Sequence, residues 1–455
     1  MLMCAYNLAR ILTAKTNEQK IISIAQTAQA NGQKIIGITQ TAQTNKHEMF
    51  NELIQARPSK TKNEEKMNYT TAGESHGRAL TAIVNDVPAG ISISQRQINE
   101  DLARRQGGYG RGDRMNIEHD TVQILSGVRF GKTIGSPVSM LIENSDWQNW
   151  EGIMSVEGEK TFETPRETTP RPGHADLVGA MKTGSDDCRD ILERASARES
   201  AARVAAAGVA REFLADLGVE VSSYVTSIGD VHMPEGNPME DAPNYSPLDI
   251  ELSAVRCPDV ETSEKMQEAI DEAREAGESL GGTFRVVACG LVSGLGGYAQ
   301  GSDRLTSRLS AALFSIPAIK GVEFGLGFEG VSRPGSKFHD PIKLIDGTFV
   351  RTSNNAGGLE GGMTNGMPLI AHVAMKPIPT LATPLRTVNL DTLDVSLASC
   401  ERSDVCAVPA ASVVAECEVA FVLASAYMEA FGNNNMDDIK ENIHTYEKRL
   451  RLAAR

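Results

Sequence analysis

From residue 67 onward, the chain alternates short apolar runs with longer amphipathic stretches. Short runs rich in β-branched residues predict strands, and longer stretches with a helical period predict helices. The predicted strands span 122–130, 137–143, 219–231, 284–292, 322–328 and 369–375, and the predicted helices span 95–105, 188–217, 263–276, 303–316, 406–431 and 433–455. Strands and helices interleave without a regular strand–helix–strand rhythm, which indicates a mixed α and β fold.

Two of the predicted helices are unusually apolar. The stretch 188–217 is rich in alanine and has few solubilising side chains between 201 and 210, and 406–431 is also apolar. A helix without a polar face is typically buried on most sides. We therefore expect the alanine-rich helix to be buried in the core. The helix 263–276 is instead charged and amphipathic, and Gly277 is placed to end it.

Residues 1–66 have a different pattern. The segments 19–32 and 33–46 form a tandem 14-residue repeat that is identical at ten positions. The repeat places isoleucines near one helical stripe, but two copies are few for a coiled coil. A polar linker, 58–66, follows and leads to Met67. We expect 1–66 to be a non-catalytic extension, flexible or helical, and 67–455 to be a single catalytic domain whose functional start is Met67.

Composition narrows the classes of partner. The hydrophobic share of 41% and the charged share of 23% are those of a soluble globular protein. A formal net charge of −14 argues against nucleic acid or an anionic membrane as a partner. We see no run of about 18 apolar residues and predict no membrane-spanning helix. The seven cysteines are scattered without a C-x-x-C pair, so we predict reduced thiols in the cytoplasm and no metal site.

Candidate chemistry lies in glycine-rich turns that carry histidine or arginine. His76 lies in the turn GESHG between two strand-like runs, and His174 lies in the segment RPGHAD. Arginines cluster in the loop 105–114 and again around Glu193 and Glu199. Arginine forks match phosphate and carboxylate oxygens, and histidine transfers protons near neutral pH. In an acidic protein this pattern predicts a local pocket for a small polyanion.

Each of these residues also has a purely structural interpretation. His174 could be an exposed loop residue, and Arg105 could interact with the end of its helix. Arg194 and Arg198, four apart on one helix, could pair with Glu193 and Glu199 in solvent. Gly361 and Gly362 could form a plain hairpin turn. Asp404 could cap the following apolar helix at its N-terminus.

Two nucleotide-binding motifs are incomplete. The glycines 108, 110 and 112 do not have the spacing of a dinucleotide-binding turn, and 127–133 is one residue short of a phosphate-binding loop. These departures argue against a P-loop phosphotransferase.

Nine blocks occur in a characteristic order: GESHGRAL, RQGGYGRGDRM, SGVRFGKTIGSP, RPGHADL, ERASARESAARVAAAG, GVEFGLGF, EGGMTNGMPL, MKPIPTL and ERSDVCAVPAA. Together they resemble the chorismate synthase family over roughly 67–431. The resemblance implies an α+β fold, a β-α-β sandwich with an internal helical layer, assembled as a homotetramer. Residues 1–66 have no counterpart in it.

The resemblance also implies a reaction. It is the last step of the shikimate pathway, which serves aromatic amino-acid biosynthesis: a lyase converts 5-enolpyruvylshikimate 3-phosphate to chorismate and phosphate by anti-1,4-elimination. The step requires reduced FMN although it has no net redox change. NADPH enters only as a possible source of electrons, and we expect an external flavin reductant because no reductase domain is evident. A flavin-dependent oxidoreductase acting on a phosphorylated carboxylate is the alternative.

Residue roles follow from the same resemblance. His76, His174 and Asp404 match the catalytic positions: proton donor near the phosphate, partner of the flavin ring, and base for the C6 proton with the flavin. The substrate-binding positions are Ser75, Arg105, Arg111, Arg114, Arg198 and Arg402. The cofactor-binding positions are Arg105, Arg111, Arg194, Ala195, Ser196, Pro317, Ala318, Gly361, Lys376, Pro377, Ile378, Pro379, Thr380 and Arg402. The sequence departs from the family at Ala195, where serine is common, at Pro317, where asparagine is common, and at Asp113 in a usually more basic loop.

Overall fold

The computed structural model describes residues 67–112, 119–161, 163–234, 236–400 and 404–453. The chain divides into two compact units, Met1–Glu64 and Glu65–Arg455, and the described residues belong to the second. The tandem repeat, Asp113, Arg114 and Arg402 lie outside the described residues.

A four-stranded antiparallel sheet forms near the start of the described chain. Its order is β1-β2-β6-β3, and alternate residues of the central strands, including Leu80, Ala82 and Val84, are fully buried. This period of two is the pattern of a sheet with one face in the core. The strands are β1 (Asn68–Ala72), β2 (Ala79–Asn85), β3 (Val122–Ile124) and β6 (Val138–Glu143).

A five-stranded antiparallel sheet forms later in the chain. Its order is β10-β15-β9-β7-β8, so β15, from near the end of the sequence, pairs between two earlier strands. Its strands are β7 (Glu220–Ile228), β8 (Val231–His232), β9 (Gly282–Cys289), β10 (Ile319–Phe324) and β15 (Leu369–Met375).

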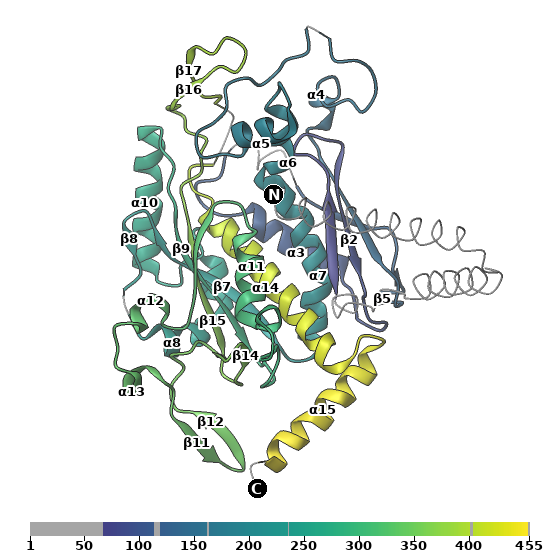
Figure 1. The fold of residues 1–455 in the computed structure, drawn as a ribbon, viewed down its shortest axis with the longest axis vertical. Helices are drawn as coiled ribbons and strands as arrows, with labels where there is room; N and C mark the ends of the chain where they lie inside the picture. The colour runs from purple at the N-terminus through teal and green to yellow at the C-terminus, as the bar shows by residue number, and fades with distance from the viewer. Residues whose placement is uncertain (1–66, 113–118, 162, 235, 401–403, 454–455) are drawn as a thin grey trace, which may run out of the picture. The chain divides into compact units, whose positions relative to one another are not determined.

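Helices lie between the two sheets (Figure 1). The alanine-rich helix α7 (Ser200–Asp216) packs on β2 and β6, whereas α14 (Val408–Phe431) packs on β7 and β9. The two helices also contact one another and α3 (Gln95–Gln106). Tyr69 on β1 donates a hydrogen bond to Glu418 on α14, 2.6 Å away. The prediction of an α+β fold is confirmed, and so is the prediction that the alanine-rich helix is buried.

Helix α14 is the second apolar helix that the sequence predicted. Among the described residues, it is the one helix that is long and apolar enough by composition to span a membrane. However, 94% of its apolar window is buried inside the protein, and Glu416 and Glu418 interrupt its apolar residues. Its composition therefore reflects burial on all sides in the core.

The predicted helix 188–217 is wrong as a single element. The structure breaks it into α6 (Arg189–Ala195), the 3₁₀ turn η3 (Ala197–Glu199) and α7. Ser196 has an extended backbone, with φ −62° and ψ 145°, and its hydroxyl accepts a hydrogen bond from the N–H of Arg198. Serine competes with helix hydrogen bonding in this way, which explains the break.

The predicted strand 122–130 is also interrupted. It forms β3 and then the short β4 (Val128–Arg129), because Gly127 has φ +83° between them. A Cβ on Gly127 would lie 2.6 Å from the carbonyl oxygen of Pro137, so only glycine fits this turn.

For the other predicted elements, most observed ends lie within a few residues of the predicted ones. One of them is α10 (Val260–Ala276), which ends at its C-cap Gly277 with φ +71°. The remaining described elements are β5 (Lys132–Thr133), α4 (Trp147–Trp150), α5 (Asp176–Thr183), α8 (Pro238–Asp241), η4 (Ala242–Asn244), α9 (Pro247–Leu252), α10 (Val260–Ala276), η5 (Gly301–Asp303), α11 (Leu305–Phe314), α12 (Gly327–Gly330), α13 (Gly335–Phe338), β11 (Ile342–Ile345), β12 (Thr348–Arg351), β13 (Leu359–Glu360), β14 (Met363–Thr364), β16 (Arg386–Val388), β17 (Val395–Leu397) and α15 (Met436–Ala453).

Candidate active site

His76 is held in the tight turn between β1 and β2. Its backbone N–H donates to Glu193 Oε2 at 2.8 Å, and its Nδ1 lies 3.0 and 3.1 Å from the two Glu193 carboxylate oxygens. The N–H of Ser75 donates to the Glu193 carbonyl at 3.0 Å. Gly73 has φ +112°, and a Cβ there would lie 2.4 Å from the Ala79 carbonyl oxygen. Glycine therefore lets the turn close, and α6 then fixes the imidazole.

An aromatic ring covers His76. Trp150, at the end of α4, stacks on the imidazole with ring centroids 3.8 Å apart and planes 20° apart. Arg189 lies over the same indole at 5.1 Å and pairs with Glu193 at 3.0 Å. Burial would raise the pKa of Glu193, but hydrogen bonds from His76 and the charge of Arg189 lower it. Glu193 is therefore a buried carboxylate anion against the histidine.

Two buried arginines lie beside this turn. Arg198 pairs with Asp120 at 2.5 Å, and Arg105 pairs with the other oxygen of the same carboxylate at 3.3 Å. Arg198 also donates to Asn144 Oδ1 at 2.8–2.9 Å, and Asn144 donates to the carbonyl of Gly77 at 2.6 Å. Asn144 thus connects the arginines to the His76 turn.

The surroundings of Arg105 are strongly basic. Burial lowers its pKa, Asp120 opposes that shift, and the charges of Arg198 and Arg111 add to it. Two guanidiniums sharing one buried carboxylate leave an excess of positive charge, which suits an anion. Arg105 is 3% exposed in the last turn of its helix, so the interpretation of Arg105 as a simple helix-end charge is wrong.

Asp404 anchors the arginine loop. Its carboxylate accepts from the N–H of Gly112 at 2.8 Å and pairs with Arg111 at 3.1 Å. The N–H of Val405 donates to the Gly110 carbonyl at 2.8 Å. The N-cap interpretation of Asp404 is wrong, because the N-cap of α14 is Ala407 and has no side-chain hydrogen bond.

The break at Ser196 separates Arg194 from Arg198. Arg194 donates to the carbonyls of Thr71 and Gly73 at 3.0 and 3.1 Å, so it supports the His76 turn from behind. The prediction that the two arginines share one helix face is wrong. The pairing with Glu193 and Glu199 in solvent is also wrong, since Glu193 binds His76 and Arg189, while Glu199 binds Arg203 at 2.8 Å.

His174 forms a second group with the turn 376–380. Its Nδ1 hydrogen-bonds Asp176, which also accepts from Arg171 Nε at 2.9 Å. Arg171 donates to Thr380 Oγ1 at 2.9 Å. Burial would raise the pKa of Asp176, but hydrogen bonds from His174 and Arg171 lower it. With its side chain 16% exposed and oriented by a buried carboxylate, His174 is no plain exposed loop residue.

Lys376 joins further predicted residues to this group. Its Nζ donates to the Gly173 carbonyl at 3.1 Å, and its backbone N–H donates to the Ala318 carbonyl at 3.0 Å. Ala318, after Pro317, has φ +69°, an uncommon conformation for a residue with a side chain. Burial lowers the pKa of Lys376. Gly361 and Gly362 form the turn between β13 and β14, so the hairpin interpretation is confirmed.

The residues around Lys376 fit a flavin mononucleotide. Lys376 and Arg171 provide cationic donors, and His174 an imidazole, suited to a phosphate or an anionic reduced ring, and prolines 377 and 379 would offer apolar surface. FMN supplies electron density to the reaction when it is bound. The described residues contain no group of three or more His, Cys, Asp or Glu side chains suited to a metal ion.

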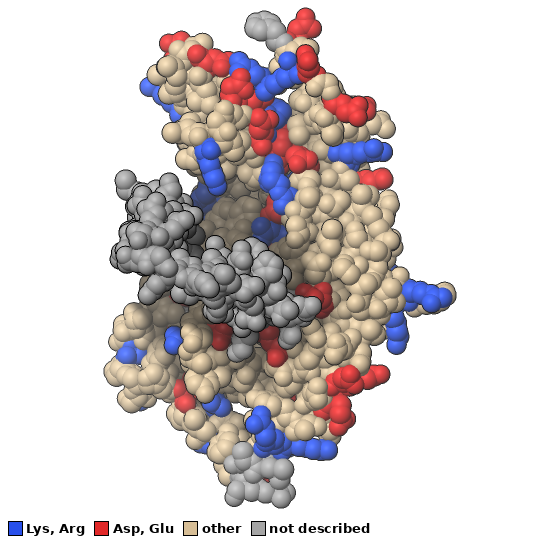
Figure 2. Space-filling model, turned by 45° about the vertical axis from the view of Figure 1, so that its right-hand side comes forward, with Lys and Arg blue, Asp and Glu red and all other residues tan. Residues whose placement is uncertain are grey.

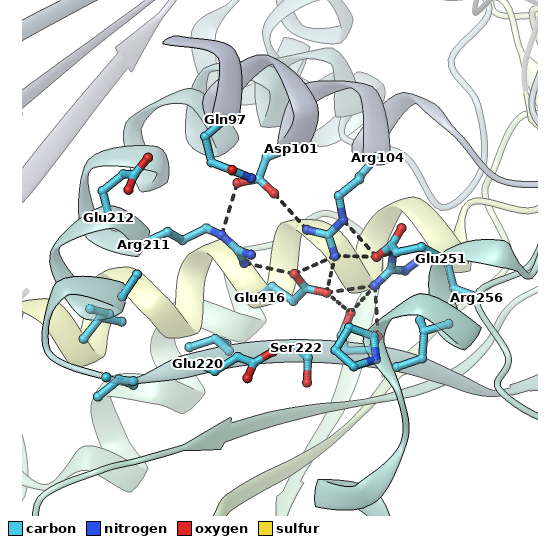
Figure 3. Close-up of a pocket in the computed structure, with 18 residues that line it drawn as sticks. Gln97, Asp101, Arg104, Arg211, Glu212, Glu220, Ser222, Glu251, Arg256 and Glu416 are labelled. Carbon is cyan, nitrogen blue, oxygen red and sulfur yellow. Dashed lines mark hydrogen bonds and ion pairs between the residues drawn. The ribbon is translucent and has the colours of Figure 1, made fainter. Parts of the chain in front are cut away.

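A separate pocket of about 570 Å³ lies away from the predicted residues (Figure 3). Arg104, Arg211 and Arg256 converge there on Glu416 of α14, which is fully buried. No predicted site residue lines this pocket. The three arginines pair there with Asp101, Glu251 and Glu416, which makes the pocket wall a structural ion-pair cluster.

Charge on the surface is uneven although the chain is acidic overall. Figure 2 shows a hollow in one face, with Lys and Arg side chains interspersed with Asp and Glu above it, and a broad area to the right with few charges.

Sequence reasoning missed the groups that orient the histidines. These are Glu193, Asp120, Asn144, Trp150, Arg171 and Asp176. Glu193, Arg171 and Asp176 lie inside the sequence blocks that resemble the family, so their place in these blocks could have marked them as site residues. Asp120, Asn144 and Trp150 lie in stretches without any motif.

A buried and a half-buried histidine, each held by a buried carboxylate beside arginines, are typical of an enzyme that transfers protons on a small polyanion. The chorismate synthase family model matches residues 67–428. The chain is 52% identical over 381 residues to "Chorismate synthase" of Syntrophotalea carbinolica, covering 84% of this chain and 98% of that protein. It is 49% identical to "Chorismate synthase" of Aquifex aeolicus, with coverage of 84% and 97%. The solved structure "Crystal Structure of Chorismate Synthase" superposes with TM-score 0.69 and 40% identity over 85% of this chain and 98% of that chain. The chain belongs to the chorismate synthase family.

Proposed function

We propose that the His76 group and the His174 group are the substrate end and the flavin end of one chorismate synthase active site. As a member of this family, the enzyme converts 5-enolpyruvylshikimate 3-phosphate to chorismate and phosphate with reduced FMN. The observation that supports this assignment is that each histidine is oriented by a buried carboxylate next to guanidinium groups.

At the substrate end, His76 donates a proton to the departing phosphate. Arg105 and Arg198 are already buried and oriented, so they stabilise the growing charge without reorganisation. Ser75 positions the turn through its backbone bond to Glu193 rather than acting as a nucleophile. Arg111 binds a carboxylate of the substrate, and Arg114 and Arg402, outside the described residues, share this task.

At the flavin end, His174 stabilises charge on the cofactor, and the turn 376–380 holds it. Lys376 supplies a cation, and Thr380 is fixed by Arg171. Pro317, Ala318, Gly361 and 194–196 complete the predicted cofactor contacts; Ala195 and Pro317 would act through their backbone, so the departures from the family pattern are tolerated.

Replacing Asp404 with asparagine is expected to slow cleavage of the C6–H bond. The amide cannot accept the proton, and it weakens the ion pair with Arg111. We expect a loss of about 10²–10⁴-fold in turnover, the usual contribution of a general base. The measurement is anaerobic single turnover with substrate deuterated at C6. A variant that keeps the wild-type rate and isotope effect would remove Asp404 from this role.

The activity itself is tested by chorismate formation under anaerobic conditions with photoreduced FMN, with and without NADPH. We expect turnover with photoreduced FMN alone, no stoichiometric NADPH consumption, and dependence on an external flavin reductant when only NADPH is supplied. Stoichiometric consumption of NADPH with substrate would instead favour the oxidoreductase alternative.

We further propose the finer features of the family for this chain. The helices between two sheets support a β-α-β sandwich with an internal helical layer, and 67–455 is the catalytic domain preceded by a non-catalytic 1–66. Assembly as a homotetramer and location in the cytoplasm are further expectations; sedimentation of the full chain tests the first.

A further inference from the structure

We propose that Glu193 is a positioning residue that sets the tautomer and orientation of His76, so that His76 delivers its proton to the substrate from Nε2. This inference rests on the proposed role of His76 in the elimination. It adds, to the contact between Glu193 and His76, the tautomer of the ring and the nitrogen that donates the proton.

The geometry around Glu193 leaves His76 little freedom. The carboxylate accepts from the His76 backbone N–H at 2.8 Å and faces His76 Nδ1 at 3.0 Å, so the main chain and the ring are held by the same group. Glu193 is 1% exposed, and Arg189 at 3.0 Å holds the carboxylate itself. Trp150 stacks on one face of the imidazole at 3.8 Å. Rotation of the ring would break its hydrogen bond to Glu193 and its stacking on Trp150 together.

The carboxylate also decides where the proton resides. A carboxylate can only accept a hydrogen bond, so the neutral imidazole carries its proton on Nδ1. When the ring is protonated, the second proton is on Nε2, and that proton passes to a phosphate oxygen as the C–O bond breaks. The ring returns to the neutral Nδ1–H tautomer, still bonded to Glu193. This is the task of the carboxylate in hydrolase triads, reached here on an unrelated arrangement.

Several charges act on this histidine. Glu193 and Arg189 face it from α6, Glu74 lies in its own turn, and Asp146 is bonded to Trp150 at 3.1 Å. Arg198 and Asp120 lie beyond Asn144. Of these, Glu193 is in direct contact with the ring and stabilises the imidazolium. Removing its charge is therefore expected to make the imidazolium less stable relative to the neutral ring.

The test is a double-mutant cycle in the full-length enzyme. It compares wild type with Glu193→Gln, His76→Ala and the combined variant by anaerobic turnover with photoreduced FMN across pH. Glutamine has the same shape and can still accept a hydrogen bond from Nδ1–H, but it lacks the charge. Glu193→Gln should therefore lower the turnover by about 10-fold or more, which is part of the rate acceleration of about 10²–10⁴-fold that a general acid usually contributes. In the plot of turnover against pH, the limb that depends on His76 should move to lower pH. In the His76→Ala background, Glu193→Gln should not lower the turnover any further.

The control is Glu199→Gln. Glu199 is a buried carboxylate six residues along the chain that pairs with Arg203, and its loss should leave the turnover and the pH limb unchanged. If Glu193→Gln does not fold, Glu193→Asp keeps the charge and shortens the reach. Glu193→Asp should lower the turnover, but it should move the His76-dependent limb of the pH–turnover profile less than a loss of the carboxylate charge would.

The inference is overturned if the cost of Glu193→Gln persists in the His76→Ala background, or if the pH limb does not move. Both outcomes would mean a structural role for Glu193 and would leave the proposed function intact. A His76→Ala enzyme with wild-type turnover would remove His76 from the proposed mechanism, and this inference with it.

Discussion

Replacing His76 with alanine is expected to lower anaerobic turnover by about 10²–10⁴-fold, the usual contribution of a positioned general acid. The imidazole is buried, stacked on Trp150 and hydrogen-bonded to Glu193, so no neighbouring group can take its place by a small movement. The arginines Arg105 and Arg198 remain, so substrate binding should change less than turnover. Single-turnover kinetics with photoreduced FMN separates the two effects.

The matched control for this substitution is His444→Ala. His444 is exposed on α15 and makes none of the contacts described for the site, so its loss should leave the rate unchanged. Thermal melts of both variants check that the fold is intact. Wild-type turnover in His76→Ala under these conditions would exclude His76 as the proton donor.

Replacing Glu416 with glutamine is expected to cost about 3–5 kcal/mol of stability, the usual penalty for removing one partner of a buried ion pair. Glu416 is fully buried and faces Arg104, Arg211 and Arg256 at 2.8–3.0 Å (Figure 3). Glutamine keeps the shape but leaves three guanidiniums without their shared counter-charge. Equilibrium unfolding in urea measures the loss.

Glu220→Gln serves as the control for Glu416. Glu220 lines the same pocket but is exposed, and its loss should change stability by less than about 0.5 kcal/mol. Equal stability of Glu416→Gln and wild type would show that the arginines find other partners or water when the carboxylate is removed.

The same cluster makes a prediction about pH. Burial would raise the pKa of Glu416, but the three arginines outweigh it and lower the pKa from 4.5 to about 2. A carboxylate with a lowered folded-state pKa stabilises the fold at pH above its unfolded value. That contribution is lost as pH falls from about 4.5 toward about 2, so the stability difference between wild type and Glu416→Gln should shrink across this window.

The sequence predicted the classes of element and the chemistry better than the contacts between them. The strand-like composition of the runs that flank the GESHG turn and the apolar composition of α7 are local properties that the sequence shows directly. The blocks around His76, His174 and Lys376 revealed the family because they are short and continuous.

What could not be predicted depends on distant pairs. His76 and Glu193 are 117 residues apart, and no local pattern selects Glu193 from the other carboxylates of the chain. The helix break at Ser196 was hidden because its flanks both favour helix; the hydroxyl bond to Arg198 decided it. Arg194 and Arg198 therefore serve different neighbours, although their spacing predicted one face.

The position of α14 between the two sheets has a consequence for how the protein is made. Tyr69 and Glu418 are joined across 349 residues of chain. A ribosome adding about 5–20 residues per second would complete these partners roughly 20–70 s apart. Until then, the inner face of the five-stranded sheet lacks the helix that packs on β7 and β9. Contacts of such high sequence separation are expected to form late in folding, after apolar strand surface has been exposed for some time.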